Sequence, residues 1–230
     1  MPSDAPHSVY AVLSGDIVKS TALSDAQLKD AREVILDGVM LLDEKLGHPL
    51  VARPDFYSGD AWQLALADPK HALRFALFIR ASLHAQLDVG TRVSIGIGPV
   101  DRIDTKRISL SSGKAFTLSG RKLSEMFGYT DFAITRGPAR TGLSSLLSGW
   151  MEVGLQHCSD HARGWTRRQA EIVALGLLHP EQTHEQLAAE LSPPVKKQTV
   201  TAALNSAHWA SITETLTVFQ SANWNDLIND

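Results

Sequence analysis

Apolar and polar residues alternate along the first 137 positions in a way that predicts strands and helices in turn. Four segments have the residue types and the alternation of strands: 8–16, 50–66, 91–103 and 131–137. The second of these is predicted to be a hairpin that turns around Ser58, Gly59 and Asp60. Residues 24–47 and 71–87 carry apolar side chains at helical spacing, and a Ser/Gly turn near residue 112 leads into another predicted helix.

The order of these elements is βαββαβ, followed by a further helix and strand. It predicts an α/β protein of the α+β kind, in which a ferredoxin-like sheet carries an appended αβ unit and helices cover one face. The pattern of apolar and polar residues changes over residues 140–155. From about residue 164 this pattern is helical, with a weak strand signal over 213–220. We therefore expect two domains, residues 1–145 and residues 146–230.

The second domain has the pattern of a helix-turn-helix over about residues 164–212. Thr166 is expected to cap a first helix that ends near Leu178, Thr183 a second, and a third helix is expected over 197–212. The start of the third helix, VKKQTV, resembles the opening of response-regulator and sigma-type recognition helices. The predicted DNA contacts at the helix starts and along the third helix are Arg167, Arg168, Lys196, Lys197, Gln198, Thr201 and Asn205.

The charge of this region argues against a simple DNA-binding domain. Residues 150–230 contain five Lys and Arg but nine Asp and Glu, a net charge of −4, whereas DNA-binding domains are usually basic. The predicted cations cluster near the helix starts, which keeps DNA contact open. The alternative is a helical unit that packs on the sheet or on another protein.

Composition narrows the class of protein. The chain has 230 residues and a formal charge of −3. It contains no apolar run of the roughly 20 residues that cross a bilayer, and its N-terminus has no secretory pattern. We therefore expect a cytoplasmic protein without membrane contact. Cys158 is the single cysteine, which excludes an internal disulfide.

The stretch YAVLSGDIVKSTAL places a carboxylate, Asp16, between a predicted strand and a small polar turn. One interpretation is that Asp16 is a surface residue and that Ser20, Thr21 or Ser24 caps the next helix. The other is a site for a metal ion and phosphate, because hard cations bind carboxylates and backbone N–H groups of a turn bind phosphate. Asp60 in the hairpin is the candidate second carboxylate.

Four stretches of the chain resemble the class III nucleotidyl cyclases in the order found in that family. They are SGDIVKST, YSGDAWQLALADPKHALRFALFIRASL, TRVSIGIGPV and GKAFTLSGRKL, within residues 8–135. The chain is most similar to the SatD-like bacterial group, in which a divergent cyclase homology domain precedes a helical segment. The resemblance implies a homodimer, since the active sites of the family form between two such domains.

The resemblance also implies roles for individual residues. Asp16 and Asp60 occupy the positions of the two aspartates that bind two divalent ions, Mg²⁺ or Mn²⁺. The phosphate-binding turn corresponds to Ile17, Val18, Ser20 and Thr21. Thr117 and Arg121 stand at the positions of the asparagine and arginine that stabilise the transition state, so that a hydroxyl replaces the amide donor.

The positions that recognise the base depart further from the family. Phe56 stands where a lysine reads the purine, and Leu110 stands where an aspartate assists it. Neither side chain forms a charge-assisted hydrogen bond. The pocket is therefore expected either to bind another ligand, by stacking on Phe56, or to bind no nucleotide productively.

These observations favour a cytoplasmic regulator. In it, a degenerate cyclase-like domain dimerises and senses a nucleotide or cyclic (di)nucleotide, and a helix-turn-helix contacts DNA. The alternative is an active class III cyclase with altered base specificity that uses Asp16, Asp60 and Arg121. A third hypothesis is a non-catalytic scaffold for protein interactions.

Overall fold

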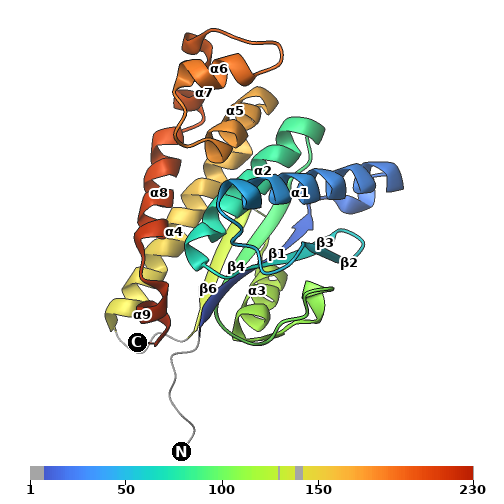
Figure 1. Ribbon diagram of the computed structural model, residues 1–230, viewed down its shortest axis with the longest axis vertical. Helices are drawn as coiled ribbons and strands as arrows, with labels where there is room; N and C mark the ends of the chain where they lie inside the picture. The colour runs from blue at the N-terminus through green and yellow to red at the C-terminus, as the bar shows by residue number, and fades with distance from the viewer. Residues whose placement is uncertain (1–7, 129, 138–141, 230) are drawn as a thin grey trace, which may run out of the picture.

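The computed structural model describes residues 8–128, 130–137 and 142–229 (Figure 1). It is a mixed fold in which a mainly antiparallel sheet lies among helices, and it confirms the predicted α+β class in this coarse form. The elements of the sheet region are β1 (Val9–Ile17), α1 (Asp25–Lys45), β2 (Asp55–Ser58), β3 (Ala61–Leu66), α2 (Ala72–Leu87), β4 (Thr91–Arg102), β5 (Ser112–Gly113), α3 (Lys114–Glu125) and β6 (Phe132–Arg136).

Among the described residues, six strands form one sheet in the order β2-β3-β1-β4-β5, and β6 also pairs with β4. β1 is antiparallel to both β3 and β4, whereas β6 is parallel to β4. The long β4 pairs with β6 over residues 93–97 and with β5 further on. The register sets Asp16 of β1 directly across from Arg92 of β4. A carboxylate and a guanidinium group therefore lie side by side where β1 ends and β4 begins.

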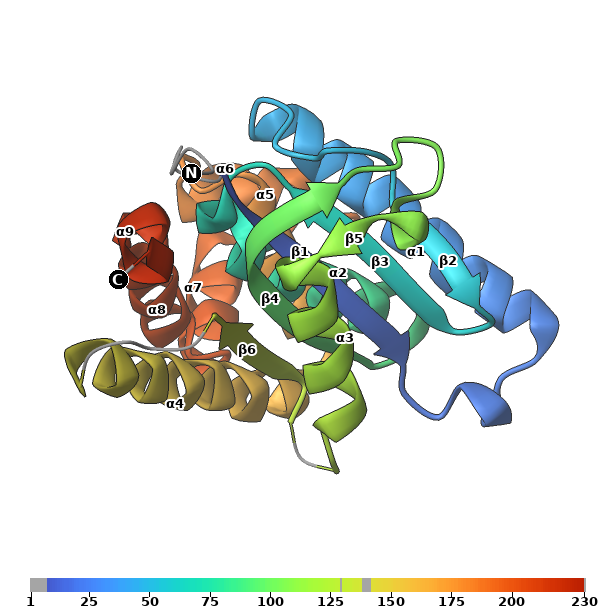
Figure 2. The same cartoon turned by 90° about the horizontal axis from the view of Figure 1, so that it is seen from below.

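Alternation along the strands gives the sheet two different faces. On one face, Leu13 and Ile95 belong to the main apolar core, which α1 and α2 cover. On the other face, Val12 packs with Ala115 of α3 in a smaller core. Figure 2 shows α3 in front of the sheet and α2 behind it. The expectation that helices cover a single face is therefore wrong, because Gly96 of β4 lets the backbone of α3 approach the second face closely.

The described residues after β6 are helical. They form α4 (Gly142–Gly164), α5 (Arg167–Leu178), α6 (His184–Glu190), α7 (Lys197–Ser206), α8 (Trp209–Ser221) and α9 (Trp224–Asn229). Thr166 and Thr183 cap α5 and α6 as predicted, and each forms a capping box with the glutamine three residues later. The single helix predicted over 197–212 is wrong. His208 has a left-handed backbone, with φ 58°, and separates α7 from α8.

The strand signal over residues 213–220 is also wrong, since these residues lie in α8. Three apolar side chains are buried at helical spacing in this helix: Ile212, Leu216 and Phe219. Three hydroxyls donate hydrogen bonds to main-chain carbonyl oxygens one turn earlier, those of Thr213, Thr215 and Thr217. The threonines favour a strand intrinsically. The buried apolar side of the helix and its satisfied hydroxyls outweigh that preference.

α5 attaches the helical region to the sheet region by packing along α2 (Figure 1). Arg74 of α2 donates a hydrogen bond to the carbonyl oxygen of Leu177 at 2.9 Å. In return, Arg167 of α5 donates to the carbonyl oxygens of Ala85 at 3.1 Å and Gln86 at 2.8 Å. Main-chain carbonyls near the C-terminal ends of both helices are thus satisfied by arginines of the neighbouring helix.

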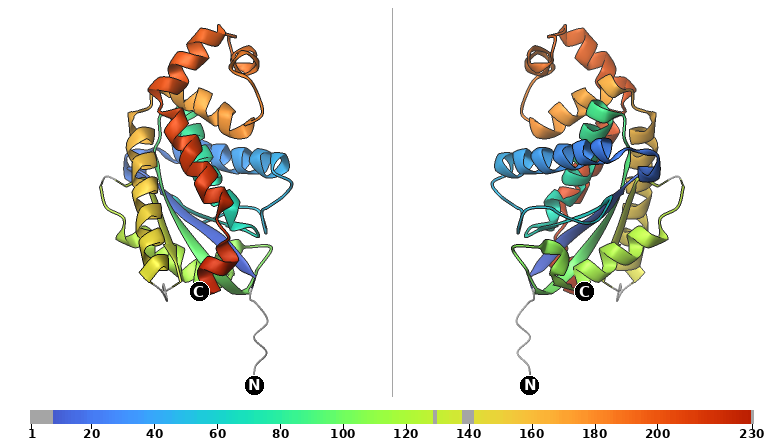
Figure 3. Two further views of the ribbon diagram at one scale, coloured as in Figure 1. Left: turned by 90° about the vertical axis from the view of Figure 1, so that its left-hand side faces the viewer. Right: turned by 90° about the vertical axis from the view of Figure 1, so that its right-hand side faces the viewer.

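The predicted boundary between residues 145 and 146 falls inside α4. Figure 3 shows this helix, in yellow, running beside the sheet. The main apolar core includes Leu13 of β1 as well as Ile172 of α5. The division into two domains therefore stays a prediction. Within the described ranges, no helix is both long enough and apolar enough to cross a membrane.

Candidate functional site

A cavity of about 470 Å³ lies at the end of β1. Six of its lining residues belong to the site predicted from the sequence: Asp16, Ile17, Val18, Ser20, Thr21 and Asp60. The sequence did not indicate the remaining lining residues, which are Lys19, Arg80, Gly90, Arg92, Gly128, Thr130, Asp131 and Arg163. The predicted metal ligands and the predicted phosphate turn thus share one cavity, while the roles assigned to them stay predictions.

The turn after β1 is separate from the cap of α1. Lys19 has a left-handed backbone, with φ 57°, and a 3-10 turn follows over Ser20–Ala22. Ser24 caps α1 and forms a capping box with Gln27. Of the three residues considered as caps, Ser24 therefore has that role. Ser20 instead donates a hydrogen bond to the carboxylate of Asp60.

The carboxylate of Asp16 is held by Arg92 across the strand pair. The Nε of Arg92 donates to Oδ1 of Asp16 at 2.9 Å, and its Nη2 donates to Oδ2. The Nη1 of the same guanidinium donates to the carbonyl oxygen of Met126 at 2.7 Å. The hydrogen bond that Arg92 donates to Asp16 raises the pKa of Arg92 above its usual value. Arg92 therefore fixes Asp16 at the cavity with both oxygens partly engaged.

Tyr57 lies within electrostatic range of both predicted metal ligands. Burial raises the pKa of Tyr57 above its usual value, and the negative charges of Asp16 and Asp60 raise it further. One phenol therefore senses both carboxylates, although they are 44 residues apart in the sequence. Two carboxylates that face one cavity form an acidic end suited to a cation.

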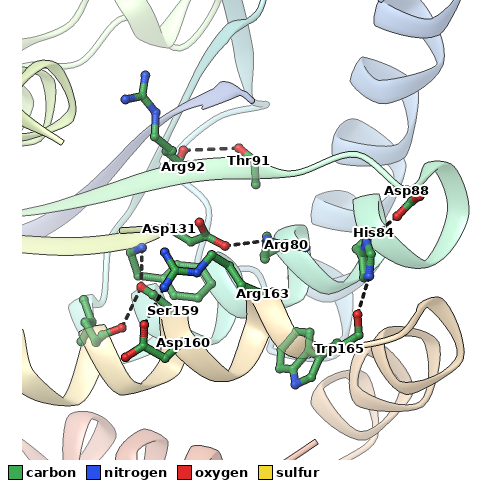
Figure 4. Close-up of polar contacts among 12 residues, drawn as sticks. Arg80, His84, Asp88, Thr91, Arg92, Asp131, Ser159, Asp160, Arg163 and Trp165 are labelled. Carbon is green, nitrogen blue, oxygen red and sulfur yellow. Dashed lines mark hydrogen bonds and ion pairs between the residues drawn. The ribbon is translucent and has the colours of Figure 1, made fainter. Parts of the chain in front are cut away.

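A second ion pair lines the cavity, between Arg80 of α2 and Asp131 just before β6. The Nε of Arg80 donates to Oδ2 of Asp131 at 3.0 Å. Arg163 at the end of α4 also lines the cavity, and Figure 4 shows it paired with Asp160, to which its Nη2 donates at 2.6 Å. Arg80 lies in the apolar run FALFIRASL, and a charged residue within such a run is the signal that would have indicated a buried ion pair.

Four residues of the predicted site lie away from the cavity lining. Phe56 packs against the main core from β2, where it pairs in register with the buried Trp62. Leu110 is half exposed in the 3-10 turn Ile108–Leu110. Thr117 and Arg121 are exposed on α3, and the hydroxyl of Thr117 donates to the carbonyl oxygen of Gly113 at 3.2 Å. Within one chain these side chains are thus not gathered with Asp16 and Asp60.

The residues predicted to contact DNA fall into two groups. Three are engaged within the chain: Arg167 with α2, as described above, Arg168 with Glu171 at 2.6 Å, and Thr201 with His184 at 2.9 Å. The other four have exposed side chains: Lys196, Lys197, Gln198 and Asn205. Arg167 and Arg168 lie at the start of α5 and Lys196 and Lys197 at the start of α7, and contact of any of them with DNA stays a prediction.

His157 and His161 of α4 take part in stacking between imidazole rings. His161 stacks on His208 with ring centroids 4.2 Å apart, and His157 lies one turn away on α4. Burial lowers the pKa of His161, and the charges of His208 and His157 lower it further. Within the part of the chain that the structure describes, no group of three or more His, Cys, Asp or Glu side chains is arranged to hold a metal ion.

Cys158 of α4 is buried in the main apolar core, and its thiol is expected to react slowly. Burial raises its pKa to about 11, so at pH 8 its thiolate fraction falls about a hundredfold below that of an unfolded cysteine. Ellman's reagent should therefore modify the native protein at least about a hundredfold more slowly than the guanidinium-unfolded chain. Equal rates in the two states would contradict the buried position.

Comparison with known proteins finds structural similarity alone. No family model matches the chain, and no curated protein matches it. Among solved structures, the crystal structure of the guanylyl cyclase Cya2 is similar with a TM-score of 0.38 and 14% sequence identity. The match covers 56% of this chain and 74% of that chain.

Proposed function

We propose that this chain is a regulatory protein that binds a phosphate-bearing nucleotide in the cavity at the end of β1. The observation that carries this proposal is that Asp16, Asp60 and the turn of residues 17–21 line the same cavity. The strand order β2-β3-β1-β4, with β1 antiparallel to both neighbours, supports a ferredoxin-like and cyclase-like interpretation of the sheet.

Mg²⁺ or Mn²⁺ is part of this proposal, because the acidic end of the cavity suits a hard cation. Mg²⁺ is usually held by one or two carboxylates together with phosphate oxygens and water. A carboxylate has about four lone-pair positions, so the hydrogen bonds from Arg92 to Asp16 and from Ser20 to Asp60 leave positions free on both. The ion would neutralise phosphate charge, while Arg92 and Ser20 keep the two carboxylates oriented.

The proposed role is binding and not cyclisation. Thr117 and Arg121 are exposed on α3, outside the cavity lining of the same chain. Phe56 and Leu110 lack the charged groups that would read a purine by hydrogen bonds. A homodimer is part of the proposal, since only a second copy would add Arg121 to this cavity.

A ligand screen tests the proposed function. The protein would be heated with nucleoside mono-, di- and triphosphates and with cyclic dinucleotides, each with and without Mg²⁺ or Mn²⁺. A ligand that binds the native state raises the melting temperature Tm, and we expect at least one nucleotide to do so more strongly with metal. If no nucleotide changes Tm under either condition, the proposal fails.

An active cyclase with altered base specificity is the second candidate, and the two carboxylates at one cavity favour it. Pure protein would be incubated with each of the four nucleoside triphosphates and Mn²⁺, and cyclic product would be measured. Our proposal expects none. Product that disappears in Arg121→Ala would instead establish an enzyme whose second copy supplies the arginine.

Contact with DNA through α7 is a further part of the proposed regulation. α5, α6 and α7 are three short helices in sequence, as a helix-turn-helix requires. Lys196, Lys197 and Gln198 are exposed at the start of α7, where the recognition helix of this motif contacts DNA.

Removal of either lysine at the start of α7 should weaken binding to duplex DNA and reduce its salt dependence. Each phosphate contact contributes about one to the slope of log K against log salt. Lys196→Ala and Lys197→Ala are each expected to lower that slope by about one, whereas the exposed Lys29→Ala on α1 leaves it unchanged. An absence of DNA binding by the wild-type chain at low salt would exclude this role.

A further inference from the structure

Arg80 is a buried cation with an unfilled hydrogen-bonding position. Its side chain is only 7% exposed, and that of its partner Asp131 is 10% exposed. The pair is joined through one nitrogen, Nε, and not through the two-pronged geometry that an arginine and a carboxylate often adopt. The Nη1 atom of Arg80 is buried without a hydrogen-bond partner. A buried charged donor without an acceptor is unfavourable, so this atom is suited to an acceptor from a ligand.

The surroundings of Arg80 favour an anionic acceptor. Arg80 lines the same cavity as Lys19, Arg92 and Arg163, while the acidic lining residues are Asp16, Asp60 and Asp131. Four cationic side chains thus line the cavity beside three acidic ones, and two of the cations besides Arg80 already form ion pairs, Arg92 with Asp16 and Arg163 with Asp160. Because the side chain of Arg80 is almost completely buried, water screens its charge weakly, and an oxyanion is preferred over a neutral acceptor here.

We infer that Arg80 forms an oxyanion subsite, in which its Nη1 donates to a phosphate group of the ligand. Arg163 faces the same cavity from the end of α4 (Figure 4). The inference rests on the proposed function in one respect, since it assigns a phosphate of the nucleotide to this end of the cavity. Such a ligand would contact the sheet region through Arg80 and the helical region through Arg163.

Arg163 lies next to the segment between α4 and α5, which contacts both α2 and α7. Two residues later, Trp165 accepts a hydrogen bond from His84 of α2 at its carbonyl oxygen, at 2.8 Å. The indole nitrogen of Trp165 donates to the carbonyl oxygen of Ala207 at the end of α7, at 3.1 Å. An oxyanion bound here therefore lies next to the segment that links α2, α4 and α7.

The test uses inorganic pyrophosphate with EDTA present, so that neither a base nor a metal ion contributes. Pyrophosphate is expected to raise Tm by roughly 5 °C at concentrations well above Kd, compared with sodium chloride of equal ionic strength. Arg163→Gln should weaken pyrophosphate binding by about tenfold, measured by calorimetry. The exposed Arg53→Gln, on the approach to β2, is the control and should leave binding unchanged.

A double variant tests Arg80 without leaving a buried charge unpaired. Arg80→Met alone leaves Asp131 buried without a partner, so it is combined with Asp131→Asn to remove both charges. The double variant should keep its circular dichroism spectrum and lose the Tm shift with pyrophosphate. An equal shift in the double variant, or none in the wild type, overturns the subsite. Metal-dependent nucleotide binding that survives in the double variant would overturn the subsite and leave the proposed function standing.

Discussion

Replacement of Gly96 by alanine is expected to lower the free energy of unfolding by about 3 kcal/mol, or roughly 6 to 12 °C in Tm. A Cβ atom at this position would lie 2.3 Å from the carbonyl oxygen of Ala115 and 2.5 Å from the amide nitrogen of Ser119. Both contacts are to the backbone of α3, which cannot give way as a flexible side chain does. Thermal or urea unfolding of the purified variant measures the loss.

Gly98→Ala is the matched control, because it adds the same atom on the same strand and the same face. Its Cβ would lie 3.5 Å from the nearest atoms, on Lys114 and Ala115, which is an ordinary contact. We expect its unfolding free energy to stay within about 1 kcal/mol of the wild type. If Gly96→Ala were as stable as Gly98→Ala, α3 would not lie as close to β4 as the structure has it.

The close approach at Gly96 also bears on the site. α3 carries Thr117 and Arg121, and its distance from β4 sets where these side chains lie on the second face of the sheet. A variant that displaces α3 would shift them directly and would act on Asp16 only through the hydrogen bond of Arg92 to Met126 at the end of α3. Gly96→Ala is therefore expected to disturb the surface around α3 more than the cavity at the end of β1.

The sequence was informative where a local pattern decides the structure. A short apolar run with β-branched and aromatic residues located β1, period-two alternation located β4, and the threonine caps located the starts of α5 and α6. The break at His208 was missed, since a left-handed backbone at a residue other than glycine has no reliable sequence signal. The weak strand signal in α8 failed because tertiary burial of one side of that helix outweighed β propensity.

In the candidate site too, residues in short motifs were predicted, whereas a contact between distant segments was not. Asp16 and Asp60 were identified from short motifs, and both line the cavity. The pairing of Arg80 with Asp131 depends on contact between segments 51 residues apart, which no local pattern encodes. Phe56 was assigned to the pocket by counting back from Asp60, yet β2 changes register between Phe56 and Ser58, and Phe56 packs against the main core. A bulge of this kind alters which face a side chain occupies.

Asp60→Asn is expected to weaken metal-dependent nucleotide binding by about a hundredfold, because a neutral amide is a poor ligand for Mg²⁺. Asp60 is a cleaner target than Asp16, whose loss of charge would leave Arg92 facing a neutral partner across the strand pair. The asparagine retains an oxygen that accepts the hydrogen bond from Ser20. The fold should therefore be kept. Calorimetric titration with the nucleotide found in the screen, with Mg²⁺ and with EDTA, measures the effect.

Asp55→Asn provides the control on the same hairpin, since Asp55 accepts its hydrogen bond from Ser109 and does not line the cavity. Its binding should match that of the wild type. Tyr57 supplies a readout that needs no ligand. Loss of the charge of Asp60 should lower the pKa of Tyr57 toward its usual value of 10.0, as followed by ultraviolet titration.

The Tyr57 pKa tests the position of Asp60, whereas nucleotide binding tests its role as a metal ligand. A lower Tyr57 pKa with unchanged nucleotide binding in Asp60→Asn would mean that Asp60 lies near Tyr57 but holds no metal ion for the nucleotide. An unchanged Tyr57 pKa would mean that burial and Asp16 account for the raised value, and nucleotide binding alone would then test Asp60 as a metal ligand. Weaker metal-dependent binding in Asp60→Asn is therefore the result that supports the metal site, and the Tyr57 pKa shows only whether Asp60 lies near that phenol.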